Sequence, residues 1–459
     1  MTLTDIFEKI DSNHKRYVQE LVELLSIPSV STYSRHKGDV QRAGEWVVNM
    51  CRRLGMEARL YPTAGHPVVY ASHCPHPDRP TLLIYGHYDV QPPEPVDEWL
   101  TPPFQPTVRD GFVYARGASD DKGQFLTYLK AIEVVMAVRG EVPINVKVLV
   151  EGEEEIGSPH LGDFLRRHKD LLKADAIAIS DGSQFAPDVP AITYGLRGLA
   201  YFQLDVTGPR VDLHSGSFGG LVMNPIQALS AILCSLKEGG DRVAVPGFYD
   251  DVADMAPWER EEMESLPLDL ANLKEYLGVE VLCGEEGYSP MERKTARPTL
   301  DINGVWGGFA GEGAKTVIPS KAGAKVSMRL VPNQDPDKIA GLFRAHVAKV
   351  CPPGVQLKVT HLHSAQPVLV SRDLPQVQAA ARAIHTGFGK DPVFIREGGS
   401  IPIVNLFQEE LGLDAILLLG WGRPDDGAHS PNERFSLEDF RRGIRSAVAL
   451  LYELAGEGA

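Results

Sequence analysis

The stretch Thr81–Val90 limits the possible folds of this chain more strongly than any other. It reads Thr-Leu-Leu-Ile-Tyr-Gly-His-Tyr-Asp-Val, so four large apolar or aromatic residues precede a glycine. Such a run is typical of a strand buried on both faces, as in parallel α/β sheets. His87 and Asp89 follow the strand, and open α/β sheets place their sites at the carboxyl ends of strands. Because residues i and i+2 of an extended segment point the same way, these two side chains can share one pocket.

Helices and strands are expected to alternate around this stretch. Helices are predicted at 4–25, 39–54 and about 123–138, and strands at 57–62, 68–73, 144–150 and 176–180. The same alternation returns beyond about 370, with helices at 375–388, 402–411 and 436–455 and strands at 392–396 and 414–420. Strands that alternate with helices indicate an α/β domain with a mainly parallel sheet flanked by helices.

The pattern changes near residue 195. Segment 197–207 alternates as a half-exposed strand does, and residues 240–300 are irregular and rich in proline and acids. Further elements are expected as a helix at 224–237, strands near 314–331, a helix at 336–350 and a strand at 356–363. We therefore predict an α/β domain formed by residues 1–195 and 367–459, split by an inserted α+β domain at 196–366.

Composition excludes several classes of protein. A chain of 459 residues predicts two or three domains, and its net charge of −15 argues against binding to nucleic acid or anionic membranes. No apolar run is long enough to span a membrane. The five cysteines include no Cys-x-x-Cys pair, which predicts reduced thiols. With no signal peptide visible at the N-terminus, we expect a cytoplasmic protein.

Acids and histidines gather at the predicted strand ends. Carboxylates that share one cleft repel each other unless a cation supplies the counter-charge, and two histidines with several acids suit zinc or manganese. More ligands than one ion requires indicate a pair of ions about 3.5–4 Å apart. The residues concerned are His87, Asp89, Asp120, Asp121, Glu154, Glu155, Asp181 and, after the last strand, His429.

Each acidic cluster also has a purely structural interpretation. Every one precedes a predicted helix, so its acids could be N-caps or first-turn residues. Lys122 could do no more than pair with Asp121. The joint placement of the clusters at strand ends favours the metal site. Serine-hydrolase and nucleotide-binding functions are weakly supported, because the chain has no Gly-x-Ser-x-Gly, Walker loop or His-Glu-x-x-His.

Seven motifs occur in an order that resembles one family, the di-metal metallopeptidases that include aminoacylase, carnosinase, cytosolic non-specific dipeptidase and succinyl-diaminopimelate desuccinylase. The resemblance runs from about residue 15 to 455 and is strongest for the carnosinase-type dipeptidases. A lid signature of that branch matches Lys315–Pro319 and Ser327–Asn333. The seven motifs are Gly86–Pro92, Arg116–Gly123, Glu151–Ser158, Ile179–Asp181, Asp212–Gly220, Arg396–Pro402 and Gly427–Glu433.

The resemblance implies a zinc-peptidase-like fold with two divalent ions per subunit, zinc in the first place and manganese as the alternative. His87 and Asp181 would hold one ion, Glu155 and His429 the other, and Asp120 would bridge both. It also implies a cis peptide after Asp120.

The same resemblance assigns the catalytic roles. Asp89 would orient His87, and Glu154 would be the general base for hydrolysis of a peptide bond by a metal-bridging hydroxide. Glu153 extends the acidic run by one residue, so the assignment of Glu154 depends on the Glu-Glu-x-Gly-Ser ending of the motif.

The resemblance further implies a dipeptide or short-peptide substrate with a free carboxylate. His214, Thr316, Arg329 and Ser400 would contact it, with His214 lent by the partner subunit of a homodimer that forms through the inserted lid domain. An N-acyl-amino-acid deacylase or desuccinylase is the alternative within the family, but its deacylases tend to have Glu where this chain has Asp181. A catalytically dead metal-binding scaffold is disfavoured by the presence of Glu154, His214 and Arg329.

Overall fold

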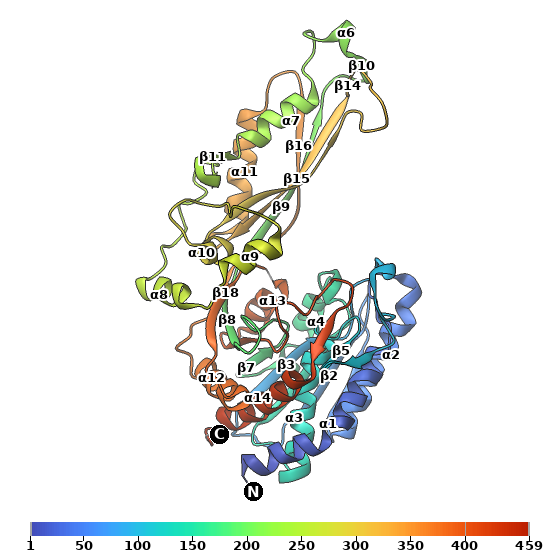
Figure 1. Ribbon diagram of the computed structural model, residues 1–459, viewed down its shortest axis with the longest axis vertical. Helices are drawn as coiled ribbons and strands as arrows, with labels where there is room; N and C mark the ends of the chain where they lie inside the picture. The colour runs from blue at the N-terminus through green and yellow to red at the C-terminus, as the bar shows by residue number, and fades with distance from the viewer. Residues whose placement is uncertain (1, 400, 458–459) are drawn as a thin grey trace. The chain divides into compact units, whose positions relative to one another are not determined.

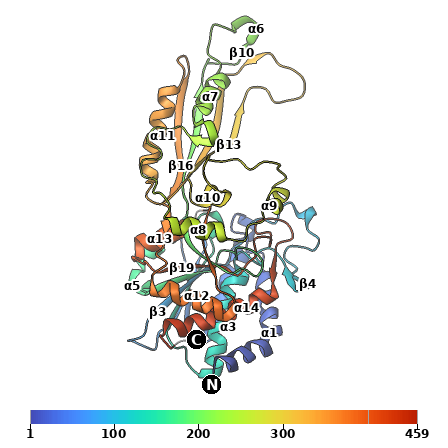
Figure 2. The ribbon, with the colours of Figure 1, turned by 60° about the vertical axis from the view of Figure 1, so that its left-hand side comes forward.

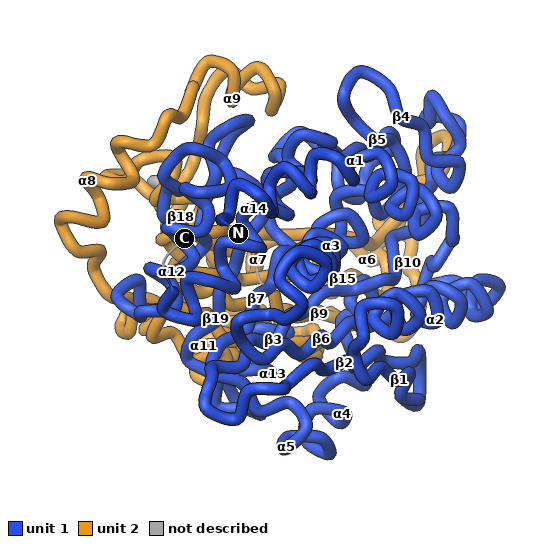
Figure 3. The backbone as a smooth tube through the Cα atoms, turned by 90° about the horizontal axis from the view of Figure 1, so that it is seen from below, with its two compact units in different colours: residues 1–194, 370–395, 403–459 blue, residues 195–369, 396–402 orange. Residues whose placement is uncertain are grey.

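The computed structural model describes residues 2–399 and 401–457 (Figure 1). The chain divides into two compact units, coloured separately in Figure 3. Unit 1 comprises Met1–Tyr194, Val370–Ile395 and Ile403–Ala459, and unit 2 comprises Gly195–Leu369 and Arg396–Pro402. The segment Arg396–Pro402 therefore belongs to unit 2, whereas the sequence placed it in the second part of the α/β domain.

The main sheet has nine strands in the order β1-β2-β6-β3-β7-β19-β8-β17, with β18 paired to β8, and all of them except β17 lie wholly or mainly in unit 1. The neighbours β6, β3, β7 and β19 pair in parallel, whereas β1, β2, β8 and β17 pair antiparallel with their neighbours in this order. The α/β class is confirmed, but the sheet is mixed, since a short connection such as that between β1 and β2 permits only antiparallel pairing. The bounds are β1 Glu57–Tyr61, β2 Val68–His73, β3 Thr81–His87, β6 Asn145–Glu151, β7 Ala176–Ile179, β8 Ala191–Leu196, β17 Val368–Leu369, β18 Val393–Glu397 and β19 Ile416–Leu419.

Helices cover both faces of this sheet. Tyr85 of β3 points to one face, where its ring meets Phe407 of α13 (Pro402–Leu411) at a centroid distance of 5.3 Å. Gly86 points to the opposite face, where a Cβ atom would lie 2.5 Å from Cβ of Phe125 in α3 (Lys122–Arg139). Glycine at 86 thus permits the close approach of α3.

The remaining elements of unit 1 complete these layers. In Figure 1, α3 and α14 run beside the strands; α14 packs against α3, α12 and α1, and α1 also packs against α3. A small sheet of order β20-β5-β4 lies in the same unit. The bounds are α1 Leu3–Leu25, α2 Lys37–Arg53, α4 Leu161–Arg167, α5 Lys169–Leu172, α12 Pro375–Phe388, α14 Leu437–Leu454, β4 Thr107–Arg109, β5 Phe112–Tyr114 and β20 Arg434–Ser436.

Unit 2 has its own antiparallel sheet, of order β13-β15-β9-β16. Alternate residues of β9 are buried, as predicted for 197–207, and α7 and α11 pack against the sheet (Figure 2). Its strands are β9 Gly198–Thr207, β13 Thr299–Gly307, β15 Lys321–Leu330 and β16 Gln356–Ala365, and these helices are α7 Pro225–Cys234 and α11 Pro336–Val350.

The stretch 240–300 is more ordered than the sequence suggested. It contains the helices α8 (Pro257–Ser265), α9 (Leu270–Leu277) and α10 (Pro290–Thr295), each too short to give a clear helical period. Two short strand pairs complete unit 2, together with the single turn α6 (Ser215–Phe218). They are β10 (Leu213–His214) with β14 (Val317–Ile318), and β11 (Lys237–Glu238) with β12 (Arg242–Val243).

The parallel register brings several strand ends to one edge of the main sheet. His87 is level with Glu151, and Tyr85 is level with Ile179. Leu418 pairs with Ile179 in turn. The loops that follow these strands therefore emerge side by side. Within the described residues, no helix has both the length and the apolar character that crossing a membrane requires.

Candidate metal centre

The first group of candidate ligands lies where β3 and β7 end. His87 Nε2 lies 3.0 Å from Asp120 Oδ1 and 3.7 Å from Asp181 Oδ1. One ligand atom from each residue falls within 4.8 Å of the others. His87 is fully buried, and the two acids are largely so.

A second group shares Asp120 with the first. His429 Nε2 lies 2.8 Å from the other oxygen of this carboxylate, Oδ2, and 3.4 Å from Glu155 Oε2. The imidazole of His429 is 58% exposed, so this side of the cluster opens to solvent. All five residues predicted as ligands thus come together in unit 1, and Asp120 offers one oxygen to each group.

The donor atoms of this cluster fit divalent cations. His87 Nδ1 lies 3.1 Å from the main-chain oxygen of Asp89, a contact that places the proton on Nδ1 and the free electron pair on Nε2. That buried Nε2 makes no hydrogen bond among the described residues, although Asp120 is near. Burial raises the pKa of Asp181, with the neighbouring imidazole of His87 opposing the rise and the charge of Asp120 adding to it, and burial likewise raises the pKa of Glu155. A cation at each group would keep these acids ionised, and the cation at the first group would accept the free electron pair of His87 Nε2.

The structure separates Glu154 from its neighbour Glu153. Glu153 Oε1 accepts a hydrogen bond of 3.0 Å from His66 N, and its Oε2 lies 2.8 Å from His160 Nδ1. No hydrogen bond or ion pair engages the carboxylate of Glu154 among the described residues. Burial raises the pKa of Glu154 to about 9, with His87 opposing the effect and Asp181 adding to it. The geometry favours Glu154 as the acid available for proton transfer.

Asp89 acts on two loops at once. Its main-chain oxygen is the closer contact to His87 Nδ1, because the carboxylate oxygen Oδ1 is 3.5 Å away. The carboxylate accepts hydrogen bonds from the main-chain N–H groups of Glu154 at 3.2 Å and Glu155 at 3.1 Å. The expected orientation of His87 by Asp89 therefore runs mainly through the main chain, while the acid itself holds the loop of Glu154.

Comparison with known proteins places this chain in a family. Peptidase family M20/M25/M40 matches residues 83–453. The chain belongs to this peptidase family. It is 36% identical to the Cys-Gly metallodipeptidase dug1 of Schizosaccharomyces pombe over 99% of both chains. It is 33% identical to the Beta-Ala-His dipeptidase of Homo sapiens, over 99% of this chain and 93% of that protein.

Solved structures agree with this assignment. Human carnosine dipeptidase 1 superposes with a TM-score of 0.85 at 33% identity, over 99% of both chains. The dipeptidase Dug1p of Saccharomyces cerevisiae gives a TM-score of 0.84 at 31% identity, also over 99% of both. The family resemblance drawn from the seven motifs is confirmed, including its carnosinase-type branch.

The peptide bond between Asp120 and Asp121 of this M20 peptidase is cis, as the resemblance implied. Asp121 is fully buried, and its Oδ2 accepts a hydrogen bond of 3.2 Å from His87 N. The side chain next to Asp120 is therefore turned toward β3 and supports the backbone of His87.

Two glutamines near the centre of the peptidase were missed by sequence reasoning. Gln91 donates from its main-chain N to Glu155 Oε1 at 3.1 Å and from Nε2 to Oε2 at 2.7 Å. Gln124 accepts from Trp421 N at 2.6 Å and donates to the main-chain oxygen of Gly182 at 3.1 Å. A search for charged or metal-binding residues passes over neutral amides, although Gln91 lies inside the motif that carries His87.

The residues expected to contact substrate lie in unit 2. His214 is exposed at the end of β10, where its Nδ1 accepts a hydrogen bond of 3.0 Å from Gly216 N. Thr316 is adjacent, since its main-chain oxygen accepts from Ser215 N at 3.0 Å. Ser400 lies outside the described residues.

Arg329 is far from this pair within the same unit. It is level with Leu199 and Thr299, near the end of β15. His214 and Thr316 lie beyond the other end of β15, which begins at Lys321. Eight residue steps from Lys321 to Arg329 span about 26 Å in a strand. The structure thus brings His214 and Thr316 together, but not with Arg329.

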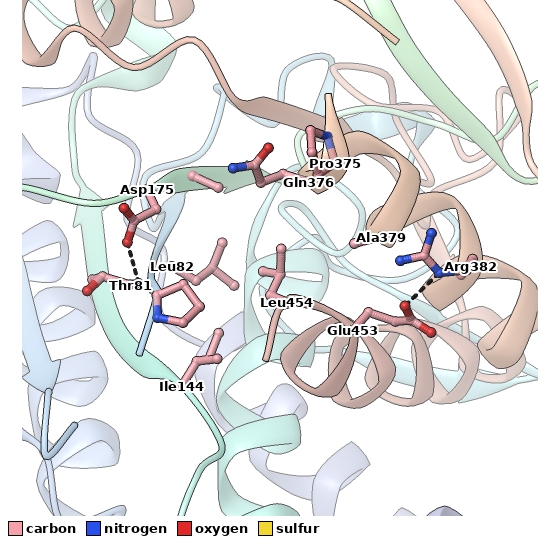
Figure 4. A pocket seen from close by; sticks show the side chains of 12 residues that line it. Thr81, Leu82, Ile144, Asp175, Pro375, Gln376, Ala379, Arg382, Glu453 and Leu454 are labelled. Atoms are coloured by element: carbon pink, nitrogen blue, oxygen red, sulfur yellow. Dashed lines mark hydrogen bonds and ion pairs between the residues drawn. The ribbon is translucent and has the colours of Figure 1, made fainter. Parts of the chain in front are cut away.

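A cavity of about 200 Å³ lies at the amino end of the main sheet in the peptidase (Figure 4). Asp175 Oδ2 accepts a hydrogen bond of 2.7 Å from Thr81 N at one side of it. Arg382 and Glu453 form an ion pair of 2.6 Å at the other side. The candidate ligands are all at the opposite, carboxyl end of the strands.

Proposed function

We propose that this M20 peptidase is a metallodipeptidase that hydrolyses the peptide bond of dipeptides or short peptides with a free carboxylate. The observation that carries the proposal is the pair of ligand groups that share Asp120. The carboxylate of Glu154 is close enough to feel the charges of His87, Asp181 and Asp120, and it makes no hydrogen bond among the described residues. The relatives named above are Cys-Gly and β-Ala-His dipeptidases. They do not favour the alternative of an N-acyl-amino-acid deacylase or desuccinylase.

We assign the ligands to two ions. His87 and Asp181 would hold one, Glu155 and His429 would hold the other, and Asp120 would be shared by both. Mixed imidazole and carboxylate ligands suit zinc, with manganese as the alternative metal. When bound, the two ions polarise the scissile carbonyl and lower the pKa of water.

Side chains of the protein then transfer the proton of the attacking water and stabilise the charge of the oxyanion. Glu154 takes a proton from the attacking water and delivers it to the leaving amine, as a general base and then acid. Asp89 keeps Glu154 in place through the N–H groups described above. His214 donates a hydrogen bond to the developing oxyanion. Arg329 binds the substrate carboxylate with its planar guanidinium, while Thr316 and Ser400 supply further contacts.

The distances within unit 2 support a homodimer with composite sites. A dipeptide spans at most about 7 Å when fully extended. His214 and Arg329 of one chain are separated by nearly the whole length of β15, so one small substrate cannot touch both. A substrate bound by Arg329 therefore requires the partner subunit's His214, and a closed two-fold dimer supplies it to both sites.

We also place the protein in the cytoplasm. Its five cysteines form no disulfide, and Cys51 is fully buried as a thiol. Reduced thiols are the usual state in that compartment. Imaging of the tagged full chain in its own cells would reveal any other location.

A substrate panel tests the proposed reaction. Dipeptides, N-acetyl amino acids and N-succinyl amino acids are offered to protein loaded with Zn²⁺ or Mn²⁺, and products are separated by chromatography. We expect hydrolysis of dipeptides, lost after dialysis against a chelator and restored by the metal. Faster hydrolysis of the acyl amino acids would overturn the assignment in favour of a deacylase.

Mixing two inactive variants tests the composite site. His214→Ala and Glu154→Ala are each expected to be inactive, because they lack different parts of the same site. Subunit exchange would create heterodimers with one intact site, so activity should return to about half the wild-type value per heterodimer. A mixture that exchanges subunits, shown by mass spectrometry, and stays inactive would contradict the shared site.

A further inference from the structure

Glu433 is a fully buried acid that the proposed reaction does not use. It lies four residues after His429, in the loop that follows β19. Both of its carboxylate oxygens accept two hydrogen bonds. Oε2 accepts from Arg116 Nη1 at 2.8 Å and from Gly117 N at 2.8 Å, and Oε1 accepts from Ser119 N at 2.9 Å and Asp120 N at 3.1 Å.

These partners all belong to the segment that leads into Asp120, the residue shared by both ligand groups. The main-chain oxygen of Glu433 extends the contact, since it accepts from Ala115 N at 3.0 Å. Arg116 is itself 1% exposed, and its guanidinium is paired with Glu433 inside the protein. One side chain therefore joins the loop of His429 to the loop of Asp120.

The loop of His429 needs such support. His429 adopts a left-handed backbone conformation with φ of 64°, and Asn432 does so with φ of 63°. A residue other than glycine keeps this conformation only where the surrounding structure holds it. Hydrogen bonds from N–H groups to a carboxylate are stronger than those between neutral groups, and Glu433 makes four of them at the end of this loop.

We propose that Glu433 is a positioning residue that fixes Asp120 against His429, so that binding of both metal ions depends on it. This inference rests on the proposed function in one respect, namely that the cluster binds two ions. Partners of metal ligands typically contribute a factor of about 10–100 to metal affinity. A purely structural ion pair would contribute to folding and leave metal affinity unchanged.

Glu433→Gln provides the test because it keeps the size of the side chain but turns an NH₂ group toward N–H donors. Metal-free wild-type and variant proteins are titrated with Co²⁺, followed by calorimetry and by the visible absorption of bound Co²⁺. We expect Glu433→Gln to bind both ions about 10–100-fold more weakly, with an altered absorption spectrum. Glu285→Gln is the control. It disrupts a largely buried ion pair in unit 2, where Glu285 contacts Arg297 at 2.7 and 2.9 Å, and should bind Co²⁺ as wild type does.

Each outcome bears on the inference. Wild-type Co²⁺ affinities and spectrum in folded Glu433→Gln would overturn it, as would a wild-type protein that binds fewer than two ions. If Glu433→Gln does not fold, Glu433→Asp is titrated instead, since it keeps the charge but is too short to reach all four donors. Failure of both variants to fold would assign Glu433 a structural role only. Wild-type protein that binds two Co²⁺ but cleaves no dipeptide would contradict the proposed function and leave this inference standing.

Discussion

The acids at the two ends of the main sheet differ in the partners of their carboxylates. At the amino end, Asp175 accepts a hydrogen bond from Thr81 N, and Glu453 pairs with Arg382. At the carboxyl end, three candidate ligand carboxylates lie together with the imidazoles of His87 and His429 among the described residues. The acids of the first region are paired within the protein, whereas those of the second are the proposed ligands of added cations.

The two basic residues of the motif Arg116–Gly123 are not partners of the candidate ligand carboxylates. Lys122 follows Asp121 in sequence, but its Nζ donates to the main-chain oxygens of Leu24 at 3.2 Å and Ile27 at 2.8 Å. Arg116 is bound to Glu433. The number of acids at a strand end thus says little about function until their partners are known.

Asp120→Ala should have the largest effect on metal binding at the carboxyl end of the sheet. Because both ligand groups share this carboxylate, the variant is expected to lose both ions and to fall to background activity. Elemental analysis after dialysis gives the ion content per chain. Glu453→Gln, at the amino end, should keep two ions. Retention of two ions by Asp120→Ala would exclude the bridging role.

Glu154→Gln should separate catalysis from metal binding. It should keep both ions and lose roughly 10²–10⁴-fold in kcat, the usual contribution of general acid–base catalysis. Glu153→Gln is the matched control, since the Glu153 carboxylate is already bound to His66 and His160. Steady-state rates on one dipeptide compare them. A greater loss in Glu153→Gln would move the base to that residue.

Gln91→Ala should have a smaller effect on one side of the cluster. The amide of Gln91 holds one oxygen of Glu155, so its loss should weaken the ion bound by Glu155 and His429 by about 10-fold. Competition with a chelator of known affinity measures both ions separately. Equal weakening of both ions would show that Gln91 does not act through Glu155 alone.

Arg382→Ala should have the smallest effect, and only on stability. The side chain of Arg382 is 57% exposed, and exposed ion pairs contribute about 0.2–1 kcal/mol. Urea unfolding with metal present measures the change, while kcat/KM should equal the wild-type value. A loss of activity without a loss of stability would link the amino-end cavity to the reaction.

Much of the fold could be predicted from local signals. The helices at 336–350, 375–388 and 402–411 have the predicted bounds, because each begins with a proline at its first position. The three short helices within 240–300 were missed, since fewer than ten residues give no clear period. The antiparallel edges of the main sheet follow from strand pairing, which no single segment reveals.

The candidate site was predictable in its residue types but not in its connections. Histidines and acids at strand ends indicate a metal site, and the structure brings the five predicted ligands together. The contacts of Gln91, Gln124 and Glu433 join loops far apart in the sequence. Such contacts depend on tertiary packing, so no local pattern could show them. The catalytic roles assigned to individual residues stay predictions.

The length of β15 makes the proposed catalysis depend on mass action. A lone chain would hold every ligand of the metal cluster yet have its own His214 at the wrong end of a ten-residue strand. Specific activity should therefore fall on dilution below the dissociation constant of the dimer, while the ion content per chain stays constant. Protein concentration would thus control the activity of this peptidase without any change in the metal centre.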